Sequence, residues 1–571
     1  MADNSDSGGE QADPAAGAPE ALADAIRLHQ DGRMDEAIAA YHSILGTDPD
    51  DAATLSALGV ALRALDRNGE ALEVLARGAE RHPDHADLAY NLGNARRDAG
   101  EADAAILCYR QALGRNPAYL GAATNLALVL NGAGRNREAA EVCTKALVLH
   151  PMQAELYTNL GVAHWYLGEH RAAAAGYRRA LALKPGEAQT LYNLGLALEA
   201  LGAPKEAAEN LRRAVELSPK SPDYLAGLGQ SLISMGDIPS AVEVFKYSLA
   251  EDPDNLDAHL GMARANLLAG HLTAGFEEYV WHRRRTINAE PDLPGPAWDG
   301  SDPAGKTILV YGEHGLGDTI QNARYIPLLA ARGARVILSC HKSLMRLFGT
   351  LDGAAEIIDQ DTLVPDYDAH VPIMEFPRLF ETALDSIPAD CPYLSPPEGT
   401  EFSSPKHIFR AGIVWSGSAR HQKDRIRSFA LDDLAPLFGI PGLIVFSLQT
   451  GEAGEDIGAS EFGHLLQDAG SDLTDFAHTA DLLRQLDLLI TADTAIAHLA
   501  GALALPVWVL LPFAPDWRWM LRRDDSPWYP TMRLFRQPAP GDWASVIASA
   551  AEALAEAAEE KRRKAAEDGA A

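Results

Sequence analysis

The sequence predicts an α-helical solenoid followed by an α/β region of two lobes. The solenoid is indicated by prolines that recur every 34 residues, because a fixed period of this length is typical of stacked helix–turn–helix units. The α/β region is indicated by strand-like apolar runs that alternate with helical patterns after residue 305, an order that favours parallel sheets. The recurring prolines are Pro49, Pro83, Pro117, Pro151, Pro185, Pro219 and Pro253.

Two further positions keep the register of the solenoid. Alanine lies twelve residues before each proline, and glycine lies ten residues after five of them. Small residues at these positions let the two helices of a unit approach closely, and the proline ring prevents the second helix from continuing. The alanines are Ala37, Ala71, Ala105, Ala139, Ala173, Ala207 and Ala241, and the glycines are Gly59, Gly93, Gly161, Gly195 and Gly229. This pattern resembles the tetratricopeptide repeat (TPR).

The repeats are expected over residues 20–285, as a superhelix of about eight units. The last unit is degenerate, with Gly275 where the others carry alanine. An acidic tail over residues 1–19 has the composition of a disordered segment. The Pro-rich stretch within residues 286–304 predicts an extended linker to the α/β region.

Composition excludes several classes of function. The formal net charge is −31, which argues against a nucleic-acid binder and against docking on anionic lipid, because both need positive charge. The four cysteines form no close pairs, which predicts neither a disulfide framework nor a metal knuckle and suits a reducing cytoplasm. No signal peptide or membrane span is evident. We therefore expect a cytoplasmic protein without membrane insertion.

The α/β region is expected to form two Rossmann-like lobes, separated by a break at 396–400. The first lobe is assigned to residues 305–400 and the second to residues 401–540, followed by a C-terminal helix and tail over 541–571. The expected strands are 307–312, 334–340 and 354–359 in the first lobe, and 411–415, 443–449, 487–493 and 506–511 in the second.

A glycine-rich turn, residues 312–319, follows the first of these strands and opens a helix. Gly315 and Gly317 permit close backbone approach, and a helix N-terminus favours an anion. The glycine spacing fits neither a P-loop nor a dinucleotide fingerprint. The alternative is an ordinary strand–helix turn in which Asp318 caps the helix.

A basic loop, residues 416–428, follows the first strand of the second lobe. Its cations, with Lys423 and Arg425 as the candidates, could hold a diphosphate together with Ser416. Gln449, at the end of the next predicted strand, is a further candidate for binding this diphosphate. The alternative is a solvated loop that pairs with surface acids.

Two more segments carry candidate chemistry. Asp493, Thr494 and His498 lie where a strand runs into a helix, and ligands of open α/β sheets bind at such ends. The alternative is a capped structural helix with a satisfied core histidine. Residues 515–529 are rich in aromatic side chains and arginine, which suits either sugar or base stacking or a packed plug between domains.

Taken together, residues 306–540 resemble a GT-B glycosyltransferase and are most similar to the ADP-heptose:lipopolysaccharide heptosyltransferase family. The resemblance implies that Asp318, in the Gly317-Asp318 pair, is the catalytic base. It also implies that the motif at 493–500 binds the donor phosphates, with Ala495 in place of the family's glycine. The family's lysine has no clean counterpart, so Lys423 or Arg425 is the candidate. The fusion to repeats resembles O-GlcNAc transferase in architecture.

Four asparagines recur at one repeat position, on the helix that is expected to face the concave groove. A carboxamide both donates and accepts hydrogen bonds, so a row of them could pair with the backbone of an acceptor protein. The alternative is that asparagine is simply common at this position. These residues are Asn91, Asn125, Asn159 and Asn193.

The sequence therefore predicts a bacterial-type glycosyltransferase that uses a nucleotide-sugar and glycosylates a hydroxyl of a protein bound by the repeats. Flagellin or another surface protein is the acceptor class that the resemblance implies. The GT-B resemblance implies that neither a metal nor a cofactor is needed. Two Asp-x-Asp triplets, at 359–361 and 366–368, would suit a metal-dependent GT-A enzyme, but such short matches arise often in so acidic a chain. The alternatives are a non-catalytic TPR scaffold with a degenerate transferase domain and a lipopolysaccharide heptosyltransferase with a lipid acceptor.

Overall fold

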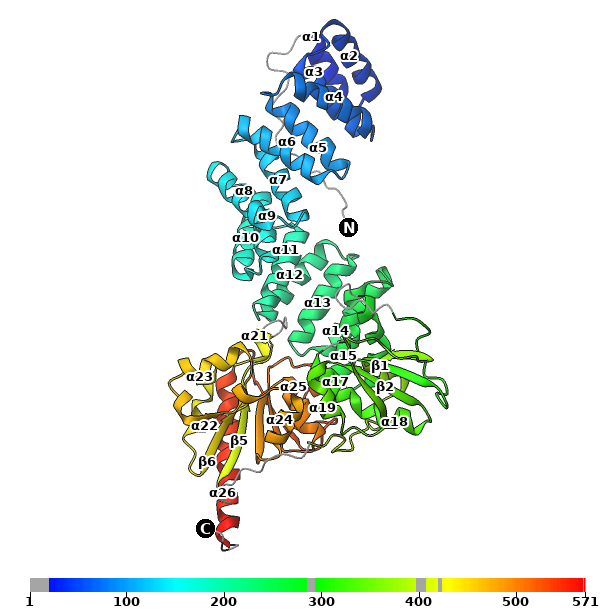
Figure 1. The fold of residues 1–571 in the computed structure, drawn as a ribbon. Helices are drawn as coiled ribbons and strands as arrows, with labels where there is room; N and C mark the ends of the chain where they lie inside the picture. The colour runs from blue at the N-terminus through cyan, green and yellow to red at the C-terminus, as the bar shows by residue number, and fades with distance from the viewer. Residues whose placement is uncertain are drawn as a thin grey trace. The chain divides into compact units, whose positions relative to one another are not determined.

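The computed structural model describes residues 20–284, 293–313, 315–396, 407–418, 424–567 and 569. The expected tail 1–19, the first part of the linker (286–292), residues 397–400 of the expected break and Lys423 lie outside these residues. The chain divides into two compact units, Met1–Pro219 and Lys220–Ala571. Each unit is described by itself (Figure 1).

Within residues 20–284, sixteen helices form eight antiparallel pairs, as the 34-residue period predicted. From the second pair to the eighth, successive pairs begin 34 residues apart. The helices are α1 (Glu20–Gln30), α2 (Met34–Thr47), α3 (Ala52–Ala64), α4 (Asn68–Arg81), α5 (Ala86–Asp98), α6 (Ala102–Arg115), α7 (Leu120–Gly132), α8 (Asn136–Leu149), α9 (Ala154–Tyr166), α10 (His170–Leu183), α11 (Ala188–Ala200), α12 (Pro204–Leu217), α13 (Pro222–Ser234), α14 (Ile238–Glu251), α15 (Leu256–Leu268) and α16 (Leu272–Tyr279).

The small residues of the repeat make the close packing of each pair possible. All seven recurring alanines are completely buried. A Cβ atom added to Gly59 would lie 2.3 Å from Cγ of Leu75, and one added to Gly229 would lie 2.5 Å from Cε1 of Phe245. Each recurring proline follows the last residue of a helix by two positions. The predicted roles of alanine, glycine and proline are therefore confirmed.

The last two helix pairs, α13 to α16, belong to the second unit together with the α/β region. The compact units therefore part at residue 219, whereas the sequence suggested a division at residue 285. Aromatic contacts explain the difference. Phe276 of α16 packs edge-on against Trp517, with ring centroids 5.4 Å apart, and Phe276 is buried as a result.

This division predicts how fragments of the chain behave. Residues 20–219 are expected to form a soluble helical array, because each repeat buries its face against its neighbours. A fragment that ends at residue 285 is also expected to be helical, but to bind the dye ANS, because Phe276 loses the indole that covers it. Circular dichroism and ANS fluorescence check this. Equal dye binding by the two fragments would contradict the assignment of α13–α16 to the second unit.

The first sheet of the second unit has four parallel strands, among the residues described, in the order β3-β2-β1-β4. The expected strands appear as β1 (Thr307–Tyr311), β2 (Arg335–Cys340) and β3 (Ala354–Asp359). The sequence analysis missed β4 (Ala369–Pro372). The end of the expected linker lies beside it, since the Trp298 backbone N–H donates to the carbonyl of His370 at 2.8 Å.

The second sheet has six parallel strands in the described part of the chain, in the order β10-β9-β8-β5-β6-β7. Four of them were expected, and β7 and β10 were missed. Of the candidate donor-binding residues described in this half, Ser416, Gln449, Asp493 and Thr494 come shortly after strands of this sheet, whereas Arg425 lies in the helix Asp424–Arg427 and His498 in the helix Ala495–Ala502. The strands are β5 (Phe409–Val414), β6 (Leu443–Ser447), β7 (Leu466–Asp468), β8 (Leu488–Ala492), β9 (Val507–Leu511) and β10 (Met532–Arg536).

Helices follow most of these strands, and the expected C-terminal helix packs on the second sheet. It buries Val546, Ile547 and Leu554 in the same apolar core as Ile490 and Leu510. The helices are α17 (Leu316–Asn322), α18 (Ile326–Ala331), α19 (Lys342–Phe348), α20 (Phe376–Leu379), α21 (Asp424–Arg427), α22 (Ala435–Phe438), α23 (Asp456–Ala459), α24 (Phe476–Leu483), α25 (Ala495–Ala502) and α26 (Trp543–Glu567). Of the helices described, none is both long and apolar enough to cross a bilayer.

Candidate functional site

Two of the predicted motifs, one from each sheet, meet at the strand ends of the second unit. The turn after β1 leads into α17, and the loop after β8 leads into α25. A Cβ atom added to Gly317 would lie 2.9 Å from Cδ2 of His498 and 3.2 Å from Cα of Ala495. Gly317 therefore permits the direct contact between α17 and α25. Ala495 lies in this contact.

This contact predicts the effect of a single methyl group. Gly317→Ala is expected to destabilise the second unit by about 1–3 kcal/mol, because the backbone of Ala495 and the buried His498 ring must shift. Gly315→Ala is a matched control, since the nearest atom to its added Cβ is Oδ2 of Asp318 at 3.5 Å. Differential scanning calorimetry of both variants checks this. A similar Tm for both would mean that the contact is loose.

Asp318 is engaged through both of its carboxylate oxygens. Oδ2 accepts a hydrogen bond from the backbone N–H of Gly315 at 3.1 Å, which caps α17. Oδ1 accepts one from Nη2 of Arg518 at 2.6 Å. The capping role that the sequence offered as an alternative is thus present, together with an ion pair that the sequence did not predict. The role of Asp318 as a base stays a prediction.

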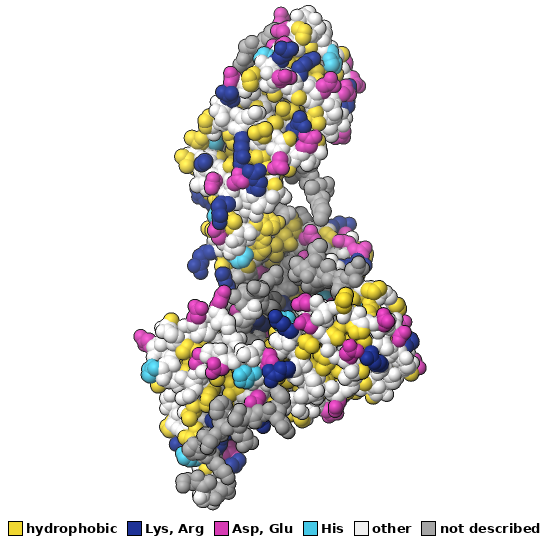
Figure 2. Space-filling model, viewed as in Figure 1, with side chains coloured by type: hydrophobic (Ala, Val, Ile, Leu, Met, Phe, Trp, Pro, Cys, Tyr) yellow, Lys and Arg dark blue, Asp and Glu magenta, His cyan; other side chains and the backbone are white. Residues whose placement is uncertain are grey.

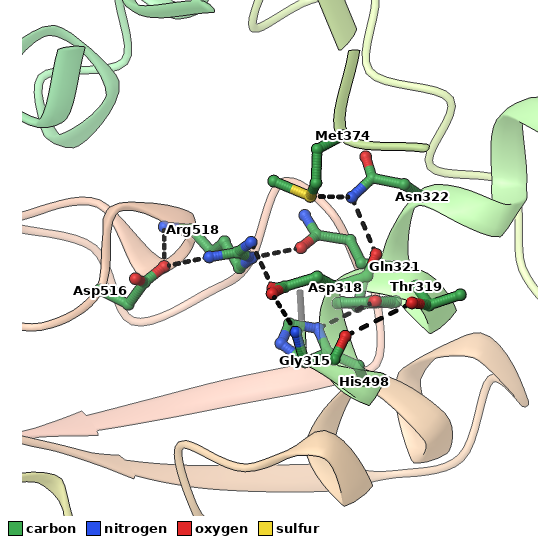
Figure 3. A network of polar contacts seen from close by, with 10 residues as sticks. Gly315, Asp318, Thr319, Gln321, Asn322, Met374, His498, Asp516 and Arg518 are labelled. Carbon is green, nitrogen blue, oxygen red and sulfur yellow. Dashed lines mark hydrogen bonds and ion pairs between the residues drawn. The ribbon is translucent and has the colours of Figure 1, made fainter. Parts of the chain in front are cut away.

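Arg518 links the two sheets and is almost completely buried, with 8% of its side chain exposed. Its Nε donates to Oε1 of Gln321 at 2.5 Å, and Nη1 donates to Oδ1 of Asp516 at 2.8 Å. Its guanidinium also lies over the ring of Trp517, 4.2 Å from the centroid. Figure 3 shows this side chain between Asp516 on one side and Asp318 and Gln321 on the other.

Unsatisfied polar atoms lie next to this ion pair. Nε2 of Gln321 and Oδ1 of Asn322 are buried and have no hydrogen-bond partner among the described residues. The Nδ2 group of Asn322 is used, since it donates to the carbonyl of Asp318 at 2.9 Å. An unpaired buried amide costs about 1–3 kcal/mol. These atoms are therefore available to water or to a polar ligand near the end of α17.

His498 is a buried core histidine in this structure. Its Nδ1 lies 3.1 Å from the hydroxyl of Tyr529, and its ring stacks on Trp519 with centroids 5.4 Å apart. Burial, with a smaller effect from the cation of Arg518, lowers the pKa of His498 to about 3. The imidazole is neutral at pH 7, so it offers a phosphate no positive charge.

Asp493 and Thr494 lie directly after β8, at the start of α25. Burial and the nearby carboxylate of Asp516 raise the pKa of Asp493 to about 6, and the cation of Arg427 opposes this rise. The hydroxyl of Thr494 lies 3.1 Å from that of Thr491, in a hydrogen bond next to the strand end. Asp493 therefore binds a proton more readily than an exposed aspartate does.

The structure describes the basic loop before residue 419 and from residue 424 onward, but not between them. Arg425 is exposed. Arg427 pairs with Asp424 at 3.1 Å and is the loop cation whose charge acts on Asp493. Of the two cations that the sequence singled out, Lys423 lies outside the described residues and Arg425 faces solvent. Arg427 is thus better placed than Arg425, and the sequence analysis did not select it.

Gln449 has a structural role that was not predicted. Its Oε1 accepts hydrogen bonds from the backbone N–H groups of Trp415 and Ser416, at 3.1 and 3.0 Å. Its Nε2 donates to the carbonyls of Ser416 and Thr450, both at 3.1 Å. All four hydrogen bonds of a carboxamide are therefore made, and they tie the end of β5 to the end of β6. The Gln449 side chain is therefore fully used within the protein, and its contact with a donor stays a prediction.

The aromatic loop at 515–529 is a packed plug, and the alternative of an open stacking surface is wrong. Trp517, Trp519, Trp528 and Tyr529 are all buried. Trp517 contacts Phe276 and Tyr279 of the last repeat, with ring centroids 5.4 and 6.5 Å apart. This loop therefore joins the last repeat to both sheets within the second unit.

Three of the four recurring asparagines hold successive repeats together in the first unit. Nδ2 of Asn91 donates to Oγ of Ser56 at 2.8 Å, and Nδ2 of Asn159 donates to the carbonyl of Thr124 at 3.3 Å. Nδ2 of Asn125 donates to Oδ1 of Asn94 at 2.8 Å. The fourth, Asn193, accepts from Gln189 of its own helix at 3.0 Å. All four are half-buried, and their contact with an acceptor protein stays a prediction.

Comparison with known proteins supports the repeats. Family models described as tetratricopeptide repeat match residues 90–154 and 158–222, and residues 28–93 and 232–274. The N-terminal region therefore carries tetratricopeptide repeats. Repeats of this kind present extended surfaces to protein partners.

One curated relative and two solved structures illustrate the similarity. Protein FlbA of Caulobacter vibrioides is 27% identical over 320 residues, which are 50% of this chain and 53% of FlbA, so the chain spans about half the length of the curated relative it matches. The crystal structure of MamA is 28% identical, covers 28% of this chain and 95% of MamA, and has a TM-score of 0.27. YrrB, a TPR protein with an unusual peptide-binding site, is 21% identical, covers 33% of this chain and 96% of YrrB, and has a TM-score of 0.29.

Proposed function

We propose that this protein is a glycosyltransferase that takes a sugar from a nucleotide-sugar and transfers it to a hydroxyl of a protein bound by its repeats. The observation that carries the proposal is the direct contact between the turn at Gly315–Asp318 and the start of α25 at Asp493–His498. Each motif follows a parallel strand of a different sheet, and ligands of α/β proteins bind outside such strand ends.

Each group at this junction has a role in the proposal. Asp318 accepts the proton of the acceptor hydroxyl as the oxygen bonds to the sugar, while the bond from the sugar to the diphosphate breaks. Arg427, beside Asp493, stabilises the charge that develops on the diphosphate. Asp318 already accepts two hydrogen bonds, but two carboxylate oxygens offer about four lone-pair sites, so a substrate hydroxyl can still reach it.

A non-catalytic scaffold is the second candidate, and specific contacts favour it. Asp318 is held by Arg518 at 2.6 Å, and the carboxamide of Gln449 is fully used within the protein. In that case the α/β region would serve to orient the repeats or to bind a nucleotide without turnover. The repeats would carry the function alone, as a protein-binding surface.

One experiment separates the two candidates. The purified full-length chain is incubated with UDP-, GDP-, ADP- and CMP-linked sugars, with and without protein extract, and nucleotide release and protein mass are measured. A transferase is expected to release nucleotide from one of the donors and to add the mass of one sugar to a protein. Nucleotide binding without release, or no response to any donor, would favour the scaffold.

A further inference from the structure

Cationic side chains without an acidic partner gather on three even-numbered helices of the first unit. Among residues 20–135, every arginine except Arg77 pairs with a carboxylate. Among residues 136–219, the only arginine or lysine side chains that do so in the described part of the chain are Arg178 and Lys184. The other arginines and lysines of this stretch are exposed on α8, α10 and α12, and they are Arg137, Lys145, Arg171, Arg179, Lys205, Arg212 and Arg213.

Six of these cations recur in register with the repeats, and we name them the cation grid. Each of α8, α10 and α12 contributes two of them, eight residues apart, which is about 12 Å along a helix axis. The helices α10 and α12 adjoin on this surface, since Nη2 of Arg178 lies 2.7 Å from Oε1 of Glu206. The grid has two rows with a spacing of 34 residues, which are Arg137, Arg171 and Lys205 in the first and Lys145, Arg179 and Arg213 in the second.

The central helix of the grid carries positive charge only. The helix α10 has three arginines and no acidic residue, although the formal net charge of the chain is −31. Interactions between exposed charges are largely screened beyond about 8 Å at physiological ionic strength. The acidic residues of distant helices therefore do not cancel the positive potential at the grid, which favours a negatively charged partner.

Exposed apolar side chains adjoin the grid at the end of α8. Val148 is 79% exposed, Leu149 52% and Met152 65%, and we name these three residues the apolar cluster. Lys145 of the grid precedes Val148 and Leu149 by three and four residues, so it is their neighbour on one helix face. Figure 2 shows hydrophobic and basic side chains close together along the edge of the repeats, at the level of α8 and α10 in Figure 1.

The next repeat brings a second grid cation to the apolar cluster. The guanidinium of Arg179 lies over the ring of Tyr157, 5.8 Å from its centroid. The hydroxyl of Tyr157 donates to the carbonyl of Pro151 at 3.3 Å, and Pro151 directly precedes Met152. The two surfaces are therefore continuous. Exposed apolar side chains with a polar rim typically mark a protein interaction site.

The acidic residues within the grid favour a polypeptide over a nucleic acid or a lipid surface. Glu141 lies midway between the two cations of α8, and Glu209 lies midway between those of α12. A continuous row of phosphates would pass close to both glutamates and be repelled by them. A polypeptide can instead place a carboxylate at each cation, an uncharged side chain at each glutamate and an apolar side chain on the apolar cluster.

We propose that the cation grid and the apolar cluster bind an acidic segment of a partner protein. The segment carries carboxylates three or four residues apart, because an extended chain rises about 3.3 Å per residue and the two cations of each grid helix are about 12 Å apart. One apolar side chain of the segment rests on Val148 and Met152. This docking surface lies on other helices than the recurring asparagines and is independent of the proposed sugar transfer.

Fluorescence anisotropy of labelled peptides with the full-length chain tests the proposal. The probe is a twelve-residue peptide with glutamate at every fourth position, one leucine, and serine and glycine elsewhere. It is expected to bind roughly tenfold more tightly than the same peptide with glutamine in place of glutamate, since several weak exposed ion pairs act together. The difference is expected to shrink in about 0.5 M salt, because the charges are then screened. Equal binding of the two peptides at low salt would overturn the proposal.

Matched arginine variants locate the binding site on the grid. Arg179→Gln is expected to weaken binding of the acidic peptide about threefold, and Arg171→Gln with Arg179→Gln roughly tenfold. Arg77→Gln is the matched control, since Arg77 is exposed and holds the same repeat position in the second pair of helices, outside the grid. It is expected to leave affinity within about 1.5-fold, because distant charges are screened. Equal losses in Arg179→Gln and Arg77→Gln would mean that the peptide responds to overall charge, and would overturn the proposal.

The apolar cluster has its own variants. Val148→Ser with Met152→Ser is expected to weaken the acidic peptide about fivefold, because its leucine loses an apolar contact. The same double variant is expected to bind a peptide with serine in place of leucine as the wild type does. Leu107→Ser is the matched control, since Leu107 of α6 is 59% exposed and lies outside the apolar cluster. An equal loss for both peptides, or an equal loss in Leu107→Ser, would overturn the placement of the segment on the apolar cluster.

Three outcomes would assign the surface to another occupant and overturn the proposal. Tighter binding of a twelve-nucleotide oligothymidylate or of phosphatidylserine vesicles than of the acidic peptide, lost in Arg171→Gln with Arg179→Gln, would indicate a phosphate-binding surface. A change from dimer to monomer in that double variant, seen by sedimentation, would indicate an interface between copies of the chain. Tighter binding of the peptide after deletion of residues 2–19 would indicate that this acidic stretch of the chain itself occupies the grid.

Discussion

Asp318→Asn is expected to slow sugar transfer about 100-fold or more while the protein stays folded. Base catalysis typically contributes 10²–10⁴-fold, and an amide cannot accept the hydroxyl proton. Asparagine keeps the shape of aspartate and can still accept the hydrogen bond from the N–H of Gly315, so the cap of α17 survives. Turnover, donor affinity and Tm are measured on the same preparation.

The ion pair with Arg518 requires its own control, because Asp318→Asn also removes a carboxylate from that cation. Asp516→Asn removes the other carboxylate, which lies 2.8 Å from the guanidinium, and leaves the proposed base in place. Turnover of Asp516→Asn is expected to stay within a few-fold of the wild type. Equal slowing in both variants would mean that Asp318 acts by positioning Arg518. Wild-type turnover in Asp318→Asn would remove Asp318 from the mechanism.

The repeats could be predicted from the sequence because their signals are local and recur. The turn inside each pair carries one further signal that the analysis did not use. It needs a left-handed residue, which is Asp66 in the second pair, at φ 57°, and glycine in the other seven described pairs. These turn glycines are Gly32, Gly100, Gly134, Gly168, Gly202, Gly236 and Gly270.

Two of the three missed strands, β4 and β7, share a physical reason. The strand β4 has only four residues, all buried, and β7 has three, two of them exposed. Runs this short show no measurable alternation, so periodicity cannot distinguish them from loops. Their pairing with longer neighbours creates them, and that pairing is a property of the folded sheet.

The candidate site was predicted only as far as its separate turns. The turn at Asp318 and the strand end at Asp493 were located because glycine, aspartate and apolar runs mark them locally. The partner of Asp318 is 200 residues away in the sequence, and no local pattern connects the two. Arg518 had been noted only as part of an aromatic segment, and its burial shows that it is the central cation of the junction.

Arg518→Met is expected to be the most destabilising single change at this junction, with a loss of about 3 kcal/mol in the second unit. Removing one partner of a buried ion pair typically costs about 3–5 kcal/mol, because the remaining charge is left unpaired. The lower end applies here, since the carboxylates of Asp318 and Asp516 are 25% and 37% exposed and water can reach them. Calorimetry should show a lower unfolding temperature for the second unit.

The surface pair of Arg523 and Asp525 provides the matched control. Their side chains lie 2.7 Å apart and are 25% and 65% exposed, so Arg523→Met should cost less than about 1 kcal/mol. Arg518→Lys keeps the charge, but an ammonium group lacks the planar fork that reaches Asp318, Asp516 and Gln321 together, so an intermediate loss is expected. If Arg518→Met melts like Arg523→Met, the network does not hold the two sheets together. A large loss in Arg518→Met with near-normal stability in Arg518→Lys would show that the charge of Arg518, more than its hydrogen-bond geometry, stabilises the junction.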